Sequence, residues 1–153
     1  MKITPKIRVT LSVRGEAQSP TRTEASARGK TILMDEPEER GGTNRGFTPV
    51  ETMVAALVGC TNVITNRIAA ARGIPIAAMK ISADAILDRR GAALEEEIAT
   101  PVPEIDLRIE CTTTATAEQV QILQNDLQKY CPVAKTLRQS GTLIRENWEI
   151  SRP

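Results

Sequence analysis

The chain of 153 residues contains no histidine. Histidine is the usual base that activates a serine or cysteine nucleophile, so the Ser-His and Cys-His pairs of many hydrolases are excluded. The three cysteines are scattered and lack the ligand spacing of a zinc site, so we expect no metal. If the chain is an enzyme, thiolate–disulfide chemistry tuned by arginine and carboxylate side chains is the simplest remaining option.

Aromatic residues and net charge are also scarce. The sequence has one Phe, one Tyr and one Trp, which leaves almost nothing to stack on nucleic-acid bases. Its formal net charge is +1, so no strong field attracts nucleic acid or an acidic membrane surface. We therefore expect no nucleic-acid partner and no membrane-surface binding.

Long hydrophobic runs are missing as well. The first residues lack the apolar region of a signal peptide. The longest apolar stretch, residues 54–68, is interrupted by Asn62, Asn66 and Arg67, so we expect no membrane span. A cytoplasmic, reducing location is then the default expectation, and there cysteines serve as reactive or buried thiols more often than as a disulfide framework.

The patterns that are present predict one α+β domain over residues 1–153. Alternating apolar residues and turn signals predict six strands, over residues 7–14, 21–27, 30–34, 79–89, 104–114 and 142–150. Helical patterns predict three helices, over residues 49–72, 117–129 and 132–139. The expected order is β-β-β-α-β-β-α-α-β, with a flexible, glycine-rich loop over residues 35–47.

The central helix has clear end signals. Thr48 suits the N-cap, Pro49 the first turn and Glu51 the capping box, while Gly73 suits the C-cap. Residues 53–60 are apolar on every face of this helix, which predicts burial all round. Because one chain of this size cannot surround a helix about 36 Å long, we infer that a second subunit covers part of it.

The three cysteines differ in the role expected from their positions in helices and strands. Cys131 precedes Pro132 and can cap the following helix, whose dipole favours a thiolate; the alternative is a buried cap residue without chemistry. Cys60 lies inside the central helix, where it is either a small core residue or a nucleophile that needs a nearby arginine. Gly59 beside it suggests the close approach of another element or a ligand. Cys111 lies on the apolar face of a strand and is expected in the core.

Two segments resemble signatures of the OsmC/Ohr family, the osmotically inducible protein C and organic hydroperoxide resistance proteins. Residues 47–61, FTPVETMVAALVGCT, resemble the family helix P-x-E-L-x-x-A-A-L-x-x-C-T. Residues 130–137, YCPVAKTL, are similar to the second signature, C-P-[VI]-x-x-x-L. The expected order of elements also matches the family along nearly the whole chain.

The resemblance implies an intertwined homodimer whose two central helices pack against each other beneath the sheets. It also implies a thiol-dependent peroxidase of oxidative-stress defence, acting on organic hydroperoxides or hydrogen peroxide. Cys60 would be the peroxidatic cysteine and Cys131 the resolving one, which reverses the order that helix ends alone suggest. An external lipoyl-type dithiol or small thiol would restore both thiols, and no bound cofactor is required.

The resemblance further implies an arginine and a glutamate beside the thiolate. Arg22 is the best match for the arginine and Arg14 the second choice, while Glu51 matches the glutamate of the P-x-E form. A straight helix puts Glu51 about 13 Å from Cys60, so a joint role needs a bridging arginine or the glutamate of a second subunit. The alternative function is an OsmC-like dimer without peroxidase activity, which binds a small apolar ligand or acts on another sulfur species.

Overall fold

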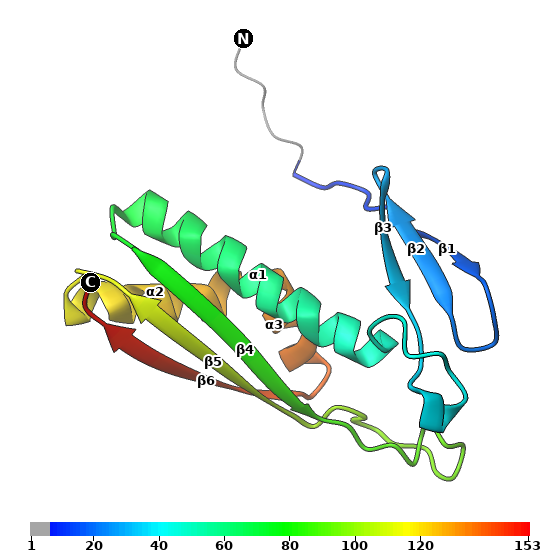
Figure 1. Ribbon diagram of the computed structural model, residues 1–153. Coiled ribbons are helices and arrows are strands. Elements are labelled where there is room, and N and C mark those ends of the chain that lie inside the picture. The colour runs from blue at the N-terminus through cyan, green and yellow to red at the C-terminus, as the bar shows by residue number, and fades with distance from the viewer. Residues whose placement is uncertain (1–6) are drawn as a thin grey trace. The chain divides into compact units, whose positions relative to one another are not determined.

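The computed structural model describes residues 7–153 (Figure 1). The chain divides into two compact units, one ending at Thr52 and the other spanning Met53–Pro153. Its elements follow the order β-β-β-α-β-β-α-α-β, which confirms the α+β class predicted from the sequence. The prediction of a single domain over the whole chain stays a prediction.

The first unit contains a three-stranded antiparallel sheet. Its strands are β1 Arg14–Ala17, β2 Thr23–Ala27 and β3 Lys30–Met34, in the order β1-β2-β3. The two residues between β2 and β3, Arg28 and Gly29, both have positive φ angles, 51° and 71°. Positive φ at both central positions is typical of the tight turns whose twist suits a two-residue hairpin. The predicted hairpin turn is therefore confirmed.

The strand predicted over residues 7–14 is wrong over most of its length. The first strand begins only at Arg14, which pairs with Ser26. The alternating apolar side chains before it are at least two-thirds exposed: Ile7, Val9, Leu11 and Val13. Alternation alone does not form a strand, because a strand also needs a neighbour for its backbone hydrogen bonds, and the described residues provide none for this segment.

The loop between β3 and the central helix is internally hydrogen-bonded, in contrast to the open, flexible loop expected. It contains the 3-10 helix η1, Glu38–Arg40, and its ends are joined by a bond from the Asp35 amide to the Phe47 carbonyl at 3.0 Å. Gly42 and Gly46 lie so close to neighbouring backbone carbonyls that a Cβ atom would meet them at 1.8 and 2.2 Å. The fold of this loop therefore requires glycine at both positions.

The second unit contains a three-stranded sheet with helices on one face. Its elements after the central helix are β4 Ala78–Ile86, β5 Glu104–Thr112, α2 Ala117–Tyr130, α3 Pro132–Gln139 and β6 Leu143–Ser151. The strand order is β4-β5-β6; β4 and β5 are antiparallel, whereas β5 and β6 are parallel and are connected through α2 and α3.

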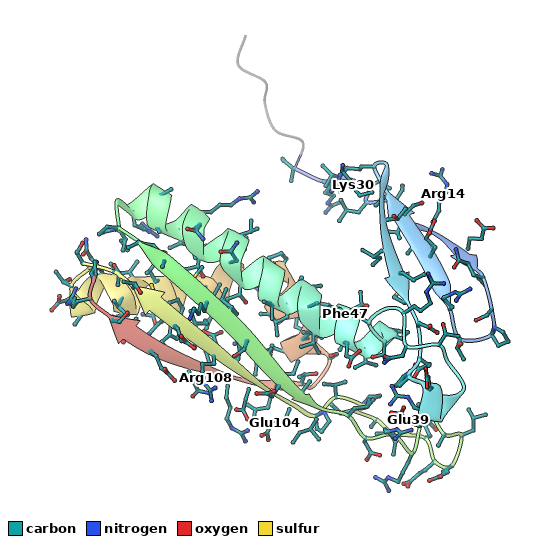
Figure 2. The ribbon with its side chains drawn as sticks, viewed as in Figure 1. Arg14, Lys30, Glu39, Phe47, Glu104 and Arg108 are labelled. Carbon is teal, nitrogen blue, oxygen red and sulfur yellow. The ribbon has the colours of Figure 1, made fainter. Side chains whose placement is uncertain are left out.

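The two faces of this sheet differ sharply in burial. Every second residue of β5 is almost completely buried: Ile105, Leu107, Ile109 and Cys111. The residues between them are polar and exposed: Asp106, Arg108 and Glu110. Arg108 extends away from the helices (Figure 2). This alternation confirms the predicted strand and places the core between the sheet and the helices.

Helix α1, Pro49–Arg72, has the ends that the sequence predicts. The Thr48 amide donates to Glu51 Oε2 at 2.7 Å and the Glu51 amide to Thr48 Oγ1 at 3.2 Å, which completes the capping box. At the other end Gly73 has a φ of 64°, and the Ile74 amide donates to the Ala69 carbonyl at 2.9 Å. These bonds satisfy the free carbonyls of the last turn.

Only one face of α1 is buried, at Leu57, Thr61, Thr65, Ile68 and Ala69. By length and hydropathy alone the helix is apolar enough to cross a membrane. Its buried face makes it a core helix of the unit, and Figure 1 shows it running along β4 and β5. The rest of the helix surface is exposed and mixed: apolar Ala55, Ala56, Gly59, Val63 and Ala70 stand beside polar Asn62, Asn66 and Arg67. The expectation of burial all round therefore does not hold within one chain.

A buried ion pair joins α3 to β6. Arg138 Nη2 donates to Glu146 Oε1 at 2.6 Å, and the Glu146 side chain is only 4 % exposed. A carboxylate this deeply buried needs a positive partner, since an unpaired buried charge is strongly destabilising. The pair thus anchors the helix that begins next to Cys131.

Candidate functional site

The structure brings Cys60 and Cys131 together, although 70 residues separate them in the sequence. Cys60 is half-buried in the middle of α1, and Cys131 is fully buried at the junction of α2 and α3. Both are free thiols, and Cys60 lies close enough to Cys131 to raise its pKa. Two neighbouring thiols, one of them accessible from solvent, are sufficient to form and break a disulfide reversibly.

The fully buried thiol is held in its protonated form. Burial, followed by the hydrogen bond and the charge of Cys60, raises the pKa of Cys131 to about 11. The backbone N–H groups of Ala134 and Val133, at the start of α3, oppose this shift but do not outweigh it. Cys131 is the N-cap of α3, as predicted. Of the two alternatives for its thiol, the protonated, buried form is the one found, because burial affects its pKa more than the helix dipole does.

The third cysteine belongs to the core. Cys111 is 1 % exposed on the inner face of β5, and burial raises the pKa of its thiol. This confirms the expectation from its strand position. At Gly59, by contrast, a Cβ would meet no atom of another element within 4 Å among the described residues, so the close approach that this glycine suggests is not made within residues 7–153.

The first unit holds Arg22 in a defined orientation. Its Nε donates to Gln18 Oε1 at 3.1 Å and its Nη1 to Thr43 Oγ1 at 3.3 Å. Both acceptors are neutral, and among the described residues no carboxylate pairs with this guanidinium. Its positive charge is therefore not neutralised.

Arg14, the second choice, is exposed on β1 and extends outward from the sheet (Figure 2). Within residues 7–153 its side chain has no hydrogen bond or ion pair, so nothing in its own unit orients it. Glu51 is exposed and its carboxylate accepts the capping-box bond from the Thr48 amide. The structure thus gives Glu51 a structural role at the start of α1.

Sequence reasoning missed Asp35, which is completely buried at the end of β3. Its carboxylate accepts bonds from the Thr43 hydroxyl at 2.5 Å and from the amides of Glu36, Thr43 and Arg45 at 2.9 to 3.2 Å. The bond from the Thr43 hydroxyl is the largest cause that lowers the pKa of Asp35 to about 2. An aspartate before a loop with paired glycines is the only sequence signal that points to it.

A groove of about 260 Å³ runs between α1 and α2. Its apolar lining comes from Ile64, Ile68, Ala71 and Tyr130. Three charged residues also line it, Arg67, Arg72 and Asp126, and the last two form an ion pair at 2.8 Å. Ile64 follows Cys60 by one helical turn and Tyr130 directly precedes Cys131, although neither cysteine lines the groove. Within residues 7–153 no group of three acidic or sulfur side chains is arranged to hold a metal ion.

The family model for OsmC-like proteins matches residues 42–146, a range that contains both Cys60 and Cys131. The chain belongs to the OsmC family. No curated protein matches this OsmC protein significantly in sequence, whereas solved structures match its fold over almost the whole chain.

An OsmC-like protein from Mycoplasma pneumoniae is 16 % identical with a TM-score of 0.75, and the match covers 95 % of this chain and 99 % of that one. The organic hydroperoxide resistance protein OsmC of Legionella pneumophila is 14 % identical with a TM-score of 0.68, over 95 % and 99 %. The organic hydroperoxide resistance protein OhrB of Bacillus subtilis is 16 % identical with a TM-score of 0.61, over 94 % and 98 %.

Proposed function

We propose that this OsmC protein is a cysteine-based peroxidase that reduces organic hydroperoxides or hydrogen peroxide. The observation that carries the proposal is the contact between a half-buried thiol, Cys60, and a fully buried, protonated one, Cys131. The names of the Legionella and Bacillus proteins, which share the fold, point to the same substrate class.

The proposed cycle has three balanced steps. The Cys60 thiolate attacks the O–O bond of the hydroperoxide, becomes a sulfenic acid and releases an alcohol once the leaving alkoxide takes up a proton. The Cys131 thiol then attacks the sulfur of the sulfenic acid, and one water leaves as the disulfide forms. An external reductant, either one lipoyl-type dithiol or two molecules of a small thiol, reduces the disulfide by exchange and is itself oxidised to a disulfide.

Arg22 is the arginine that we propose to stabilise the Cys60 thiolate. It is held by neutral acceptors and keeps its full charge, which favours it over the unconstrained Arg14. Glu51 is proposed to orient this arginine in the assembled protein. A guanidinium beside a thiolate favours the charged, nucleophilic form of sulfur.

We also propose that the protein is a homodimer. The exposed face of α1 carries small apolar residues, namely Ala55, Ala56, Gly59, Val63 and Ala70, and a second copy of the helix would cover them. Sedimentation at micromolar concentration should give about twice the chain mass of 16.7 kDa. A monomer under these conditions contradicts the dimer without affecting the thiol chemistry.

The deciding experiment is intact-mass spectrometry after one equivalent of cumene hydroperoxide. The expected result is a loss of two hydrogens, mapped to a Cys60–Cys131 disulfide and reversed by a dithiol. In Cys131→Ser, Cys60 should oxidise further, to sulfinic acid, because no thiol intercepts the sulfenic acid. Cys111→Ser is the matched control and should behave as the wild type, since Cys111 is buried in the core.

The alternative function is favoured by one observation, the groove between α1 and α2 with its apolar residues Ile64, Ile68 and Ala71. A protein that binds a small apolar ligand there would keep its mass after hydroperoxide treatment, and Cys60 would alkylate no faster than an ordinary cysteine. Binding of a hydrophobic fluorescent probe, lost in Ile68→Glu, would then identify the groove as the site.

A further inference from the structure

We propose that Asp35 and Thr43 form a relay that positions the guanidinium of Arg22 for its part in the peroxidase reaction. This inference rests on the proposed function and names two positioning residues that act through the arginine. The relay runs from Asp35 Oδ2 to Thr43 Oγ1 at 2.5 Å and from there to Arg22 Nη1 at 3.3 Å.

The start of the relay is a carboxylate with almost no freedom. Asp35 is fully buried, and its two oxygens accept five hydrogen bonds, from Thr21 Oγ1, the Thr43 hydroxyl and the amides of Glu36, Thr43 and Arg45. The donors come from both sides of the loop and from the β1–β2 hairpin. The carboxylate therefore fixes the position of Thr43 relative to the strand that follows Arg22.

The middle of the relay has a defined polarity. A threonine hydroxyl has one hydrogen to donate and two lone pairs to accept with. The hydrogen of Thr43 is committed to Asp35, since an ionised carboxylate can only accept. Only the lone pairs remain for Arg22, whose guanidinium can only donate. The ionised state of Asp35 thus sets the direction of both bonds.

The relay orients the arginine without cancelling its charge. In the described chain the guanidinium contacts only neutral oxygen atoms, so its charge stays available for the two proposed partners, the Glu51 carboxylate and the Cys60 thiolate. The Asp35 carboxylate is one hydroxyl away, and the second hold on the side chain is the neutral amide of Gln18 at 3.1 Å. Arg22 is therefore constrained at Nε and Nη1 while its full positive charge remains available.

The local sequence makes this geometry possible. Thr43 directly follows Gly42, where any Cβ would collide with the Glu36 backbone carbonyl, and the loop closes so tightly only because this side chain is absent. The Asn44 amide donates to the same Glu36 carbonyl at 3.0 Å. The residues on both sides of Thr43 are thus held by contacts with the Glu36 carbonyl, and these contacts fix the position of the Thr43 hydroxyl.

The test compares Thr43→Val, which keeps the shape but removes the hydroxyl, with Thr43→Ser, which keeps the hydroxyl. Two quantities are measured: the alkylation rate of Cys60 as a function of pH, and kcat/KM for cumene hydroperoxide with a dithiol reductant. We expect Thr43→Val to lower both by about tenfold, the factor for one hydrogen bond to a charged group, and Thr43→Ser to restore them.

A double-mutant cycle with Arg22→Gln separates positioning from general damage to the loop. If Thr43 acts through Arg22, adding Thr43→Val to Arg22→Gln changes neither quantity further. Asp35→Asn, which has nearly the same shape, should give a similar loss that also disappears in the Arg22→Gln background. It serves as the second variant if Thr43→Val does not fold, which thermal unfolding monitors.

The outcomes distinguish the relay from the function on which it rests. If Arg22→Gln slows Cys60 but Thr43→Val does not, or if the two losses add in full, the relay is overturned while the peroxidase proposal stands. If Arg22→Gln has no effect although the wild type consumes hydroperoxide, the assignment of the arginine is wrong and the relay falls with it.

Discussion

Alkylation of the reduced protein provides a quantitative test of the two thiols, because iodoacetamide reacts with the thiolate only. Burial and the neighbouring Cys60 raise the pKa of Cys131 to about 11, against 9.0 for an unperturbed thiol. At about pH 7.5 its thiolate fraction is then roughly a hundredth of that of a free cysteine. We expect Cys131 to alkylate at least about a hundredfold more slowly, since zero exposure also hinders access.

The assay follows each cysteine separately by mass spectrometry of its peptide after timed quenching. The chain unfolded in guanidinium chloride is the reference, where the three cysteines should react alike. Cys111, also buried and with a raised pKa, is the internal comparison. In the folded protein Cys60 should react first, and the logarithm of the Cys131 rate should rise with pH at a slope near one up to about pH 10.

Two results would refute this reasoning. If Cys131 reacts within about threefold of its rate in the unfolded chain, burial does not keep it protonated. If Cys131 reacts faster than Cys60, the roles are reversed and the helix-end argument from the sequence is restored. Either result is visible before any peroxide is added.

Three further predictions concern the scaffold. Arg138→Met leaves the Glu146 carboxylate buried without a partner and should lower the free energy of unfolding in urea by about 3–5 kcal/mol. The double variant Arg138→Met/Glu146→Leu should regain most of the lost free energy. The pKa of Asp35 is about 2 in the folded chain and about 3.9 in the unfolded chain, so its ionised form stabilises the fold above about pH 4. This contribution should disappear between about pH 4 and pH 2. In Asp35→Asn the melting temperature should therefore depend less on pH over this range. Gly46→Ala places a methyl 2.2 Å from a backbone carbonyl and should lower the free energy of unfolding in urea by about 1–3 kcal/mol or more. Gly15→Ala meets only a side-chain methyl at 3.4 Å and should leave this free energy nearly unchanged.

The parts of the fold that local chemistry decides could be predicted from the sequence. The capping box of Thr48 and Glu51 and the proline at position 132 set the starts of α1 and α3, and both helices have the predicted bounds. A cap is a contact between residues three apart, so neighbouring letters contain it. The prediction of a strand over residues 7–14 failed because a strand also needs a partner strand, which the local pattern does not reveal.

In the candidate site, too, local patterns predict part of the arrangement and long-range contacts decide the rest. The family motifs identify Cys60 and Cys131 as candidate site residues, but their proximity and the burial of Cys131 depend on how the folded chain places α1 next to the junction of α2 and α3. Asp35 escaped notice because its importance arises from donors eight and ten residues further along a folded loop. Long-range contacts of this kind have no signature in the local pattern.

The unequal surroundings of the two thiols give the proposed cycle its direction. Among the causes that raise the pKa of Cys131 are the charge and the hydrogen bond of Cys60. A Cys60 thiolate would therefore keep Cys131 protonated, and the pair would not hold two competing negative charges. Once Cys60 is a neutral sulfenic acid, the contribution of its charge is gone and only burial still opposes ionisation of Cys131. Oxidation of the first thiol would thus favour the second as a nucleophile at the step that requires it.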